Sequence, residues 1–290
     1  MLYIFKYKCK KILLIVSQKL YKLLLYLLPL KKGTNYIRRD VPIVISLTSY
    51  PVRFSYLPFC LKSLLYQTVK PDKIILWLGS DTKERQIPPK LKVFEKFGVE
   101  IILLKENLKS HKKYFYAMQK YPNDIIITVD DDVIYSPFLV SSLLKTHKLY
   151  PAVVCARRVH KIKIDNDRLL PYRYWETSYE KETEPSKLLM GIGVGGILYP
   201  SNCLYKDSFD IQKIQELCFD ADDIWLKFME ILNGSPVVWC KCLWIHPIKI
   251  NENDTTGLER SNVENNGNDL FIQKMLNAYP QFISDIKERI

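Results

Sequence analysis

The feature of this sequence that most constrains its fold is a regular alternation of short apolar runs with amphipathic segments between residues 41 and 158. The apolar runs are short enough to be buried strands, and the segments between them have a helical period and end near Gly98 or Pro122. Such alternation is typical of an α/β fold with a doubly wound, mostly parallel sheet. The expected strands are 41–50, 70–79, 99–105, 124–132 and 152–158, and the expected helices are 56–69, 88–98, 109–122 and 137–151.

Three consecutive carboxylates, Asp130 to Asp132, follow the fourth expected strand. Adjacent like charges repel and are costly to bury without partners, so a positive group is expected beside them. In a doubly wound sheet the carboxyl ends of the strands form the ligand-binding edge, and residues 48–50 end the first strand at the same edge. Oxygen ligands of this kind suit a hard divalent cation, Mg²⁺ or Mn²⁺, that completes its coordination with substrate phosphates.

The net charge of +12 is concentrated at the N-terminus. Residues 1–39 contain ten Lys or Arg and no Asp or Glu, whereas the rest of the chain has 33 basic and 31 acidic side chains. The nearly neutral body argues against a nucleic-acid partner. Because residues 2–30 contain no uncharged run near the roughly 20 residues that span a bilayer, we expect residues 1–30 to form a basic amphipathic helix on an anionic membrane surface. A helix packed on the protein's own core and a single span with tolerated lysines are the alternatives.

Beyond residue 158 the pattern changes. Residues 164–187 are expected to form a long loop, and residues 190–200 hold four of the ten glycines without the spacing of a dinucleotide site, which favours close backbone approach to a ligand. A helix over 219–234, a strand or strand pair over 236–248, an Asn-rich loop over 251–270 and a final helix from 271 follow. We therefore expect an arm and linker (1–39), an α/β domain (40–250) and a C-terminal segment (251–290) packed on that domain.

The seven cysteines are odd in number and include no C-x-x-C pair, which favours reduced, buried thiols in a cytosolic protein. Cys240 and Cys242 lie two residues apart and close to His246. This leaves a soft-metal site open as an alternative, although four ligands are not visible.

The order of several segments resembles glycosyltransferase family 2 of bacteria, whose members have the Rossmann-like GT-A fold. These segments are VISLTSYPVR, QTVKPDKIILW, ITVDDDVIY, GIGVGG, DADDIWL and WIHP, and they span about residues 41–250. The resemblance implies a metal site of the D-x-D type at Asp130 and Asp132. It also implies that His246 is a third metal ligand, and the alternative is a histidine that is only hydrogen-bonded at a strand end before Pro247. One of the two lysines at 112 and 113 is expected to reach ribose or phosphate, and the residues expected at the donor are Thr48, Tyr50, Arg53, Lys113, Asp130 and Asp131.

The resemblance also suggests the catalytic base and the acceptor side of the site. An inverting transfer needs a general base, and Asp223, with Asp222 as second choice, matches an acidic pair that begins a helix in the family. The alternative is that both acids only stabilise the helix N-terminus. Trp175 is expected to stack on an acceptor sugar unless it belongs to the core, and Gly195 and Gly196 are expected beside the acceptor.

The function implied is transfer of a sugar from a nucleotide-diphosphate donor, UDP being the first choice, to a lipid-linked or growing polysaccharide of a capsule or lipopolysaccharide. The enzyme would be cytoplasmic and peripheral on the inner face of the plasma membrane. One alternative is a metal-dependent nucleotidyltransferase, although the first strand is not followed by a glycine-rich loop. The other is a non-catalytic carbohydrate-binding protein, which would not need the acidic triplet.

Overall fold

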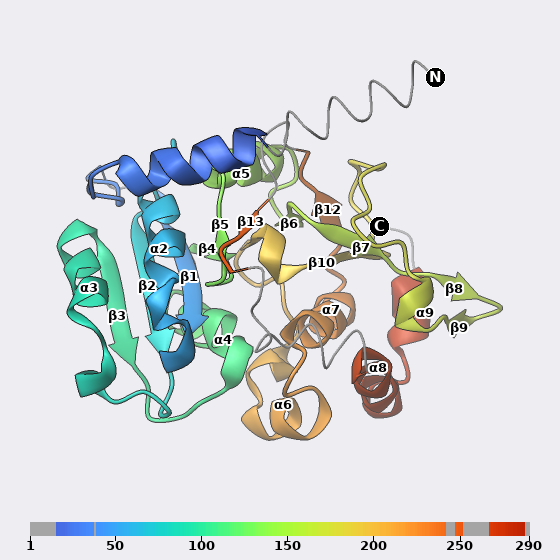
Figure 1. Ribbon diagram of the computed structural model, residues 1–290. Helices are drawn as coiled ribbons and strands as arrows, with labels where there is room; N and C mark the ends of the chain where they lie inside the picture. The colour runs from blue at the N-terminus through green and yellow to red at the C-terminus, as the bar shows by residue number, and fades with distance from the viewer. Residues whose placement is uncertain (1–15, 38, 242–246, 252–266, 288–290) are drawn as a thin grey trace, which may run out of the picture.

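A mixed, mostly parallel sheet forms the centre of the computed structural model, which describes residues 16–37, 39–241, 247–251 and 267–287 (Figure 1). Within these ranges the sheet has seven strands in the order β12-β6-β11-β4-β1-β2-β3. β11 is antiparallel to both neighbours, and the other pairs are parallel. The predicted doubly wound α/β fold is therefore confirmed. The strands are β1 (Ile43–Ser49), β2 (Lys73–Leu78), β3 (Val99–Leu103), β4 (Ile125–Thr128), β6 (Val154–Ala156), β11 (Ile197–Tyr199) and β12 (Val237–Trp239).

The central strands are apolar on both faces because helices cover both sides of the sheet. Ile45 and Leu47 of β1 pack into a core under α2, α3 and α5, whereas Val44 points to the opposite face, near α4. A second large core lies between the sheet and α7 to α9, where the rings of Phe228 and Phe282 stack with centroids 3.9 Å apart. The helices are α2 (Leu57–Leu65), α3 (Pro89–Lys92), α4 (Lys112–Lys120), α5 (Leu139–Leu149), α6 (Ile211–Leu217), α7 (Asp222–Leu232), α8 (Gly267–Ala278) and α9 (Phe282–Lys287).

Several boundaries differ from the expected ones for local reasons. The helix expected over 88–98 is α3 followed by a 3-10 turn, and Gly98 ends it with a φ of 99°, as its C-cap position requires. The loop expected over 164–187 contains a hairpin, β8–β9. The run 236–248 is split: β12 joins the main sheet and β13 pairs with β5. The remaining strands are β5 (Val133–Ile134), β7 (Val159–Lys161), β8 (Ile164–Asp165), β9 (Arg168–Leu169), β10 (Leu189–Gly191) and β13 (Ile248–Lys249).

The described part of the N-terminal arm is a helix over residues 16–27, drawn in blue across the top of the molecule near α2 and α5 (Figure 1). Leu25 is fully buried, the Tyr21 hydroxyl donates to the Tyr135 carbonyl at 3.0 Å, and Lys22 Nζ donates to the Ile250 carbonyl at 3.1 Å. Lys22 therefore faces the body of the protein, whereas Lys19 of the same helix is exposed. Among the described residues, no helix combines the length and apolarity needed to cross a membrane.

Candidate active site

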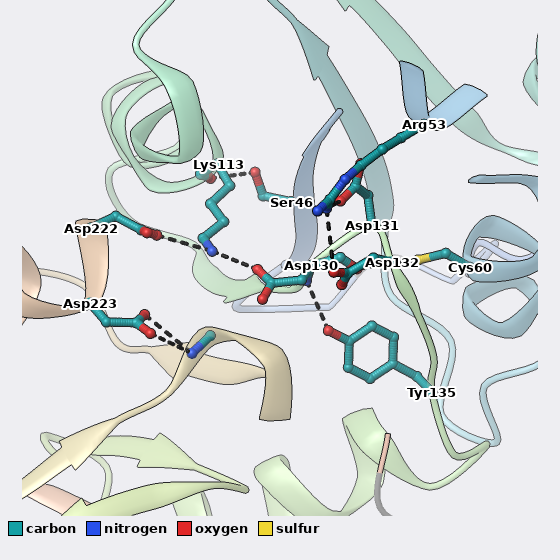
Figure 2. A network of polar contacts seen from close by, with 11 residues as sticks. Ser46, Arg53, Cys60, Lys113, Asp130, Asp131, Asp132, Tyr135, Asp222 and Asp223 are labelled. Atoms are coloured by element: carbon teal, nitrogen blue, oxygen red, sulfur yellow. Dashed lines mark hydrogen bonds and ion pairs between the residues drawn. The ribbon is translucent and has the colours of Figure 1, made fainter. Parts of the chain in front are cut away.

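The acidic triplet lies directly beyond β4, at the carboxyl edge of the sheet and between β1 and β11. Its backbone is fixed by groups from other elements. The Asp130 N–H donates to the Tyr135 hydroxyl at 2.8 Å, the Cys60 thiol donates to the Asp130 carbonyl at 3.3 Å, and the Ile250 N–H donates to the Asp132 carbonyl at 2.9 Å. The three carboxylates therefore project from a rigid turn, and their side chains have different partners (Figure 2).

Arg53 supplies part of the positive charge that the triplet requires. It lies in the 3-10 turn Pro51–Ser55 after β1, and its Nη1 atom is 2.5 Å from Asp131 Oδ1 and 3.4 Å from Asp132 Oδ2. Burial raises the pKa of Asp131 even though Arg53 opposes this shift. Burial works against the Arg53 charge as well, yet attraction by the two carboxylates and Tyr50 raises its pKa. Asp131 and Arg53 thus form a buried ion pair, with side-chain exposures of 6% and 10%.

Lys113, from the first turn of α4, connects the triplet to the start of α7. Its Nζ atom is 2.7 Å from Asp130 Oδ1 and 3.0 Å from Asp222 Oδ2, and the side chain is 5% exposed (Figure 2). The Ser46 hydroxyl of β1 donates to the Lys113 carbonyl and so fixes the start of α4 against the sheet. Burial opposes the charge of Lys113, but Asp130 and Asp222 raise its pKa, so the ammonium form is retained.

Asp222 and Asp223 are adjacent in the first turn of α7 but lie in different electrostatic environments. Burial opposes ionisation of Asp222, and Lys113 outweighs it, so the pKa of Asp222 is lowered. Burial, followed by the charges of Asp222 and Asp130, raises the pKa of Asp223 to about 8. The Asp223 carboxylate accepts the Gly193 N–H at 3.1 and 3.2 Å. One carboxylate is therefore held by a lysine, and its neighbour is poised to take up or release a proton near neutral pH.

The triplet offers two carboxylates that suit a hard cation. Asp130 and Asp132 have side chains that are 28% and 30% exposed, and burial together with Asp130 raises the pKa of Asp132 to about 6. No three His, Cys, Asp or Glu side chains of the described ranges converge into a complete ligand set. The residues present therefore fit a Mg²⁺ or Mn²⁺ ion that takes its other ligands from phosphate and water. His246 and Cys242 lie outside the described residues.

The other residues expected at the donor lie around this centre. The Tyr50 hydroxyl accepts from Arg53 Nε at 3.2 Å, and the Thr48 hydroxyl donates to the Trp77 carbonyl at 2.9 Å, so both are anchored at the end of β1. Of the two lysines in question, Lys113 enters the site. Lys112 instead donates to Asn107 Oδ1 at 2.5 Å, away from Asp130, and burial lowers its pKa to about 8.

The residues expected at the acceptor have packing roles in this structure. Trp175 is 6% exposed and its indole N–H donates to the Leu170 carbonyl at 2.8 Å, so its ring belongs to the core, as our alternative interpretation held. Tyr174, which is 53% exposed, is the neighbour that faces solvent. A Cβ at Gly195 would lie 2.7 Å from the Arg158 backbone nitrogen, and Gly196 has a φ of +85°.

Gly193 is the site residue that the sequence did not single out from its neighbours. A Cβ at this position would lie 2.9 Å from Lys113 Nζ, 3.2 Å from Asp223 Oδ1 and 3.3 Å from Asp130 Oδ1. Gly193 therefore keeps open the space between the triplet and α7. The glycine-rich run in the sequence predicted that the backbone approaches a ligand closely, but it did not indicate which of the glycines lies in the site.

Comparisons with known proteins agree with this geometry. A family model described as "Glycosyl transferase family 2" matches residues 45–210, which is more than half of the chain. The chain belongs to glycosyl transferase family 2. As a member of that family it is a glycosyltransferase, as the sequence resemblance implied. The matched segment contains most of β1, the triplet and the glycine-rich run.

Solved structures show the fold of this family 2 glycosyltransferase. A crystal structure of residues 1–349 of TarS from S. aureus superposes with a TM-score of 0.52 at 15% identity, covering 85% of this chain and 70% of that one. The mannosyltransferase PcManGT from Pyrobaculum calidifontis, solved with GDP-Man and Mn²⁺, gives a TM-score of 0.49 at 9% identity, covering 83% of this chain and 65% of that one. Among curated proteins, no sequence matches the chain. The superposition on TarS, together with the order of the sheet, confirms the predicted GT-A fold.

Proposed function

We propose that this glycosyltransferase transfers a sugar from a nucleoside-diphosphate donor, UDP being the first choice, to a hydroxyl group of a lipid-linked or growing surface glycan. The observation that carries the proposal is the arrangement around Lys113. Its ammonium group bridges Asp130 of the triplet and Asp222 at the start of α7, and Asp223 lies beside them with a raised pKa. A place for a diphosphate and a candidate base for the acceptor hydroxyl are therefore held within one small site.

The donor side of the proposal rests on Asp130 and Asp132. These carboxylates would hold Mg²⁺ or Mn²⁺, which supplies positive charge to the departing diphosphate. Arg53 favours the ionised forms of Asp131 and Asp132 and orients them, and Lys113 adds a fixed cation beside Asp130. The end of β1, with Thr48 and Tyr50, would face the nucleotide.

For the acceptor side we assign the base to Asp223 rather than Asp222. Asp222 is engaged by Lys113 and its lowered pKa makes it a weak base, so it is expected to position Lys113. The raised pKa of Asp223 makes it a stronger base, and the Gly193 N–H fixes its carboxylate. We further propose a cytoplasmic enzyme that is peripheral on the inner face of the plasma membrane, because the basic arm of residues 1–39 would bring the site to lipid-linked acceptors of capsule or lipopolysaccharide synthesis.

Calorimetric titration of UDP, GDP and CMP, each with Mn²⁺ or with EDTA, tests the donor class. We expect UDP to bind only with the metal and binding to be lost in Asp132→Asn, because removing a ligand charge weakens the metal site. Asp223→Asn should bind UDP normally but lose at least 100-fold in turnover. Absence of metal-dependent nucleotide binding by a folded protein would refute the proposal, and release of pyrophosphate from a nucleoside triphosphate would favour a nucleotidyltransferase.

The pH dependence of kcat/KM tests the base. Asp223 must be ionised to accept a proton, so kcat/KM is expected to rise with pH through about 8, where the free enzyme loses that proton. A profile that stays flat across neutral pH, with chemistry shown to limit the rate, would contradict the assignment.

A further inference from the structure

The outward face of the N-terminal helix is unusually apolar. Leu20, Leu23, Leu24 and Leu27 follow the i, i+3, i+4, i+7 spacing that places side chains on one face of a helix. Their exposed fractions are 63%, 55%, 49% and 69%, and Val16 one turn earlier is 55% exposed. A row of exposed leucines differs from the scattered apolar residues of an ordinary surface and marks an interaction site. We call these four leucines the leucine ridge.

The ridge cannot turn inward, because the opposite face of the same helix is bonded to the body. Leu25 is fully buried there, and Tyr21 and Lys22 donate hydrogen bonds to the Tyr135 and Ile250 carbonyls. A helix that served only to cover the core would direct its leucines inward and its lysine outward. The observed orientation therefore requires another occupant for the ridge.

The charges around the ridge indicate which occupant fits. Residues 1–39 contain no acidic side chain, and Lys19, Lys31 and Lys32 are exposed along the helix and just beyond it. Tyr26 is 67% exposed and combines an apolar ring with a polar tip, as side chains at a lipid headgroup layer do. Apolar side chains between lysines match an anionic bilayer surface, in which an amphipathic helix lies in the plane with its leucines among the acyl chains.

The inner face of the helix leads to the acidic triplet through two short relays. Tyr21 donates to the Tyr135 carbonyl, and the Tyr135 hydroxyl accepts the Asp130 N–H. Lys22 donates to the Ile250 carbonyl, and the Ile250 N–H donates to the Asp132 carbonyl. The helix that carries the ridge is therefore only two hydrogen bonds from the backbone of both candidate metal-binding residues.

We propose that the leucine ridge is a membrane-docking face that inserts into an anionic bilayer surface, and that Tyr21 and Lys22 set the orientation of the acidic edge relative to that surface. The proposal deepens the peripheral membrane association stated above and specifies the lipid-facing side chains. It depends on the proposed glycosyl transfer only for the identity of the acceptor. The two proposals can therefore fail independently: the protein could bind nucleotide but not vesicles, or vesicles but not nucleotide.

The full chain is tested by co-sedimentation with phosphatidylcholine vesicles, with and without phosphatidylglycerol. We expect binding that requires the anionic lipid, weakens with salt, and falls at least tenfold in the triple variant Leu20→Gln/Leu24→Gln/Leu27→Gln. Leu270→Gln, at a leucine of α8 that is 58% exposed, is the matched control and should bind like the wild type. The circular-dichroism spectrum and the Tm of the triple variant should match those of the wild type, which confirms that it is folded.

Three results would overturn the docking proposal. The triple variant could bind anionic vesicles as well as the wild type does, or the wild type could bind neutral vesicles equally well. Alternatively, sedimentation velocity without lipid could show a dimer that the triple variant dissociates, which would identify a second copy of the chain as the occupant. For the orienting role, Tyr21→Phe should leave vesicle binding intact and lower kcat on vesicles more than kcat on a short soluble acceptor. Equal losses on both would contradict that role.

Discussion

Replacing Arg53 by Met should destabilise the protein through the charge it leaves behind. At the observed 2.5 Å separation from Asp131, the Coulomb attraction is roughly 6–7 kcal/mol for an effective dielectric constant of about 20. Desolvation of both ions offsets part of this attraction, and loss of one partner from such a buried pair costs about 3–5 kcal/mol. Because the two side chains are only 10% and 6% exposed, solvent screening reduces this value little.

The loss of stability caused by Arg53→Met should depend on pH, and the titration of Asp131 determines the direction of that dependence. Burial raises the pKa of this carboxyl in the folded protein, so the folded state binds more protons than the unfolded state and stability falls as pH rises above the unfolded value. Without Arg53 the pKa of Asp131 in the folded protein rises further, so the loss of stability with rising pH becomes larger. The destabilisation by Arg53→Met should therefore be smaller in acid, where protonation removes the unpaired charge of Asp131, and should grow as the pH rises.

Urea unfolding followed by tryptophan fluorescence, with EDTA to remove divalent ions, measures these differences. The double variant Arg53→Met/Asp131→Asn should recover most of the loss, because no unpaired charge remains at Asp131. Lys73→Met is the control for an exposed ion pair, since Lys73 and Glu100 are 38% and 42% exposed, and it should cost less than about 1 kcal/mol. Equal losses for the single and double variants, or a loss independent of pH, would refute the reasoning.

Two further predictions concern the cores and the glycine-rich run. Lys227→Met should lower the free energy of unfolding by about 3–5 kcal/mol, because it leaves Glu230 buried without its partner and both side chains are only 2% exposed. In urea unfolding, the double variant Lys227→Met/Glu230→Leu should recover most of that stability. A double variant as unstable as the single one would argue against a charge effect. Gly193→Ala should lower kcat with little change in Tm because its Cβ meets the flexible end of Lys113, whereas Gly195→Ala should lower Tm because its Cβ meets the Arg158 backbone. Similar effects of the two alanines would contradict this distinction.

The sequence alone was sufficient to predict those parts of the fold and the site that a local residue pattern determines. The apolar runs that became β1, β2 and β4 are buried on both faces, and the partly buried edge strand β3 is apolar as well, so their sequences alone identified them as strands. The triplet lies at the edge where a parallel sheet binds ligands, and the charge expected beside it comes from Arg53 and Lys113.

The side-chain environments that the sequence could not predict depend on contacts between residues far apart in the chain. Asp222 and Asp223 are adjacent acids at a helix start, and their environments differ because Lys113 pairs with Asp222 while the Gly193 N–H donates to Asp223. Trp175 could have faced a ligand or the core, and it is buried in the core that residues of α7, α8 and α9 complete. The inward orientation of Lys22 depends on the Ile250 carbonyl, more than 200 residues away in the chain. Residue types and spacing carry no information about such pairs.

The stacking of α9 on α7 has a consequence for biosynthesis. Asp222 and Asp223 begin α7, while Phe228 of the same helix is packed against Phe282 of α9, and Lys187 Nζ donates to the Asp285 carbonyl at 3.0 Å. A nascent chain therefore cannot finish the core beneath these acids until α9 has left the ribosome, whereas the helix of residues 16–27 emerges long before. Translation thus delivers the leucine ridge well before the helix that supports Asp222 and Asp223, so the proposed docking face is available before the core beneath these acids is complete.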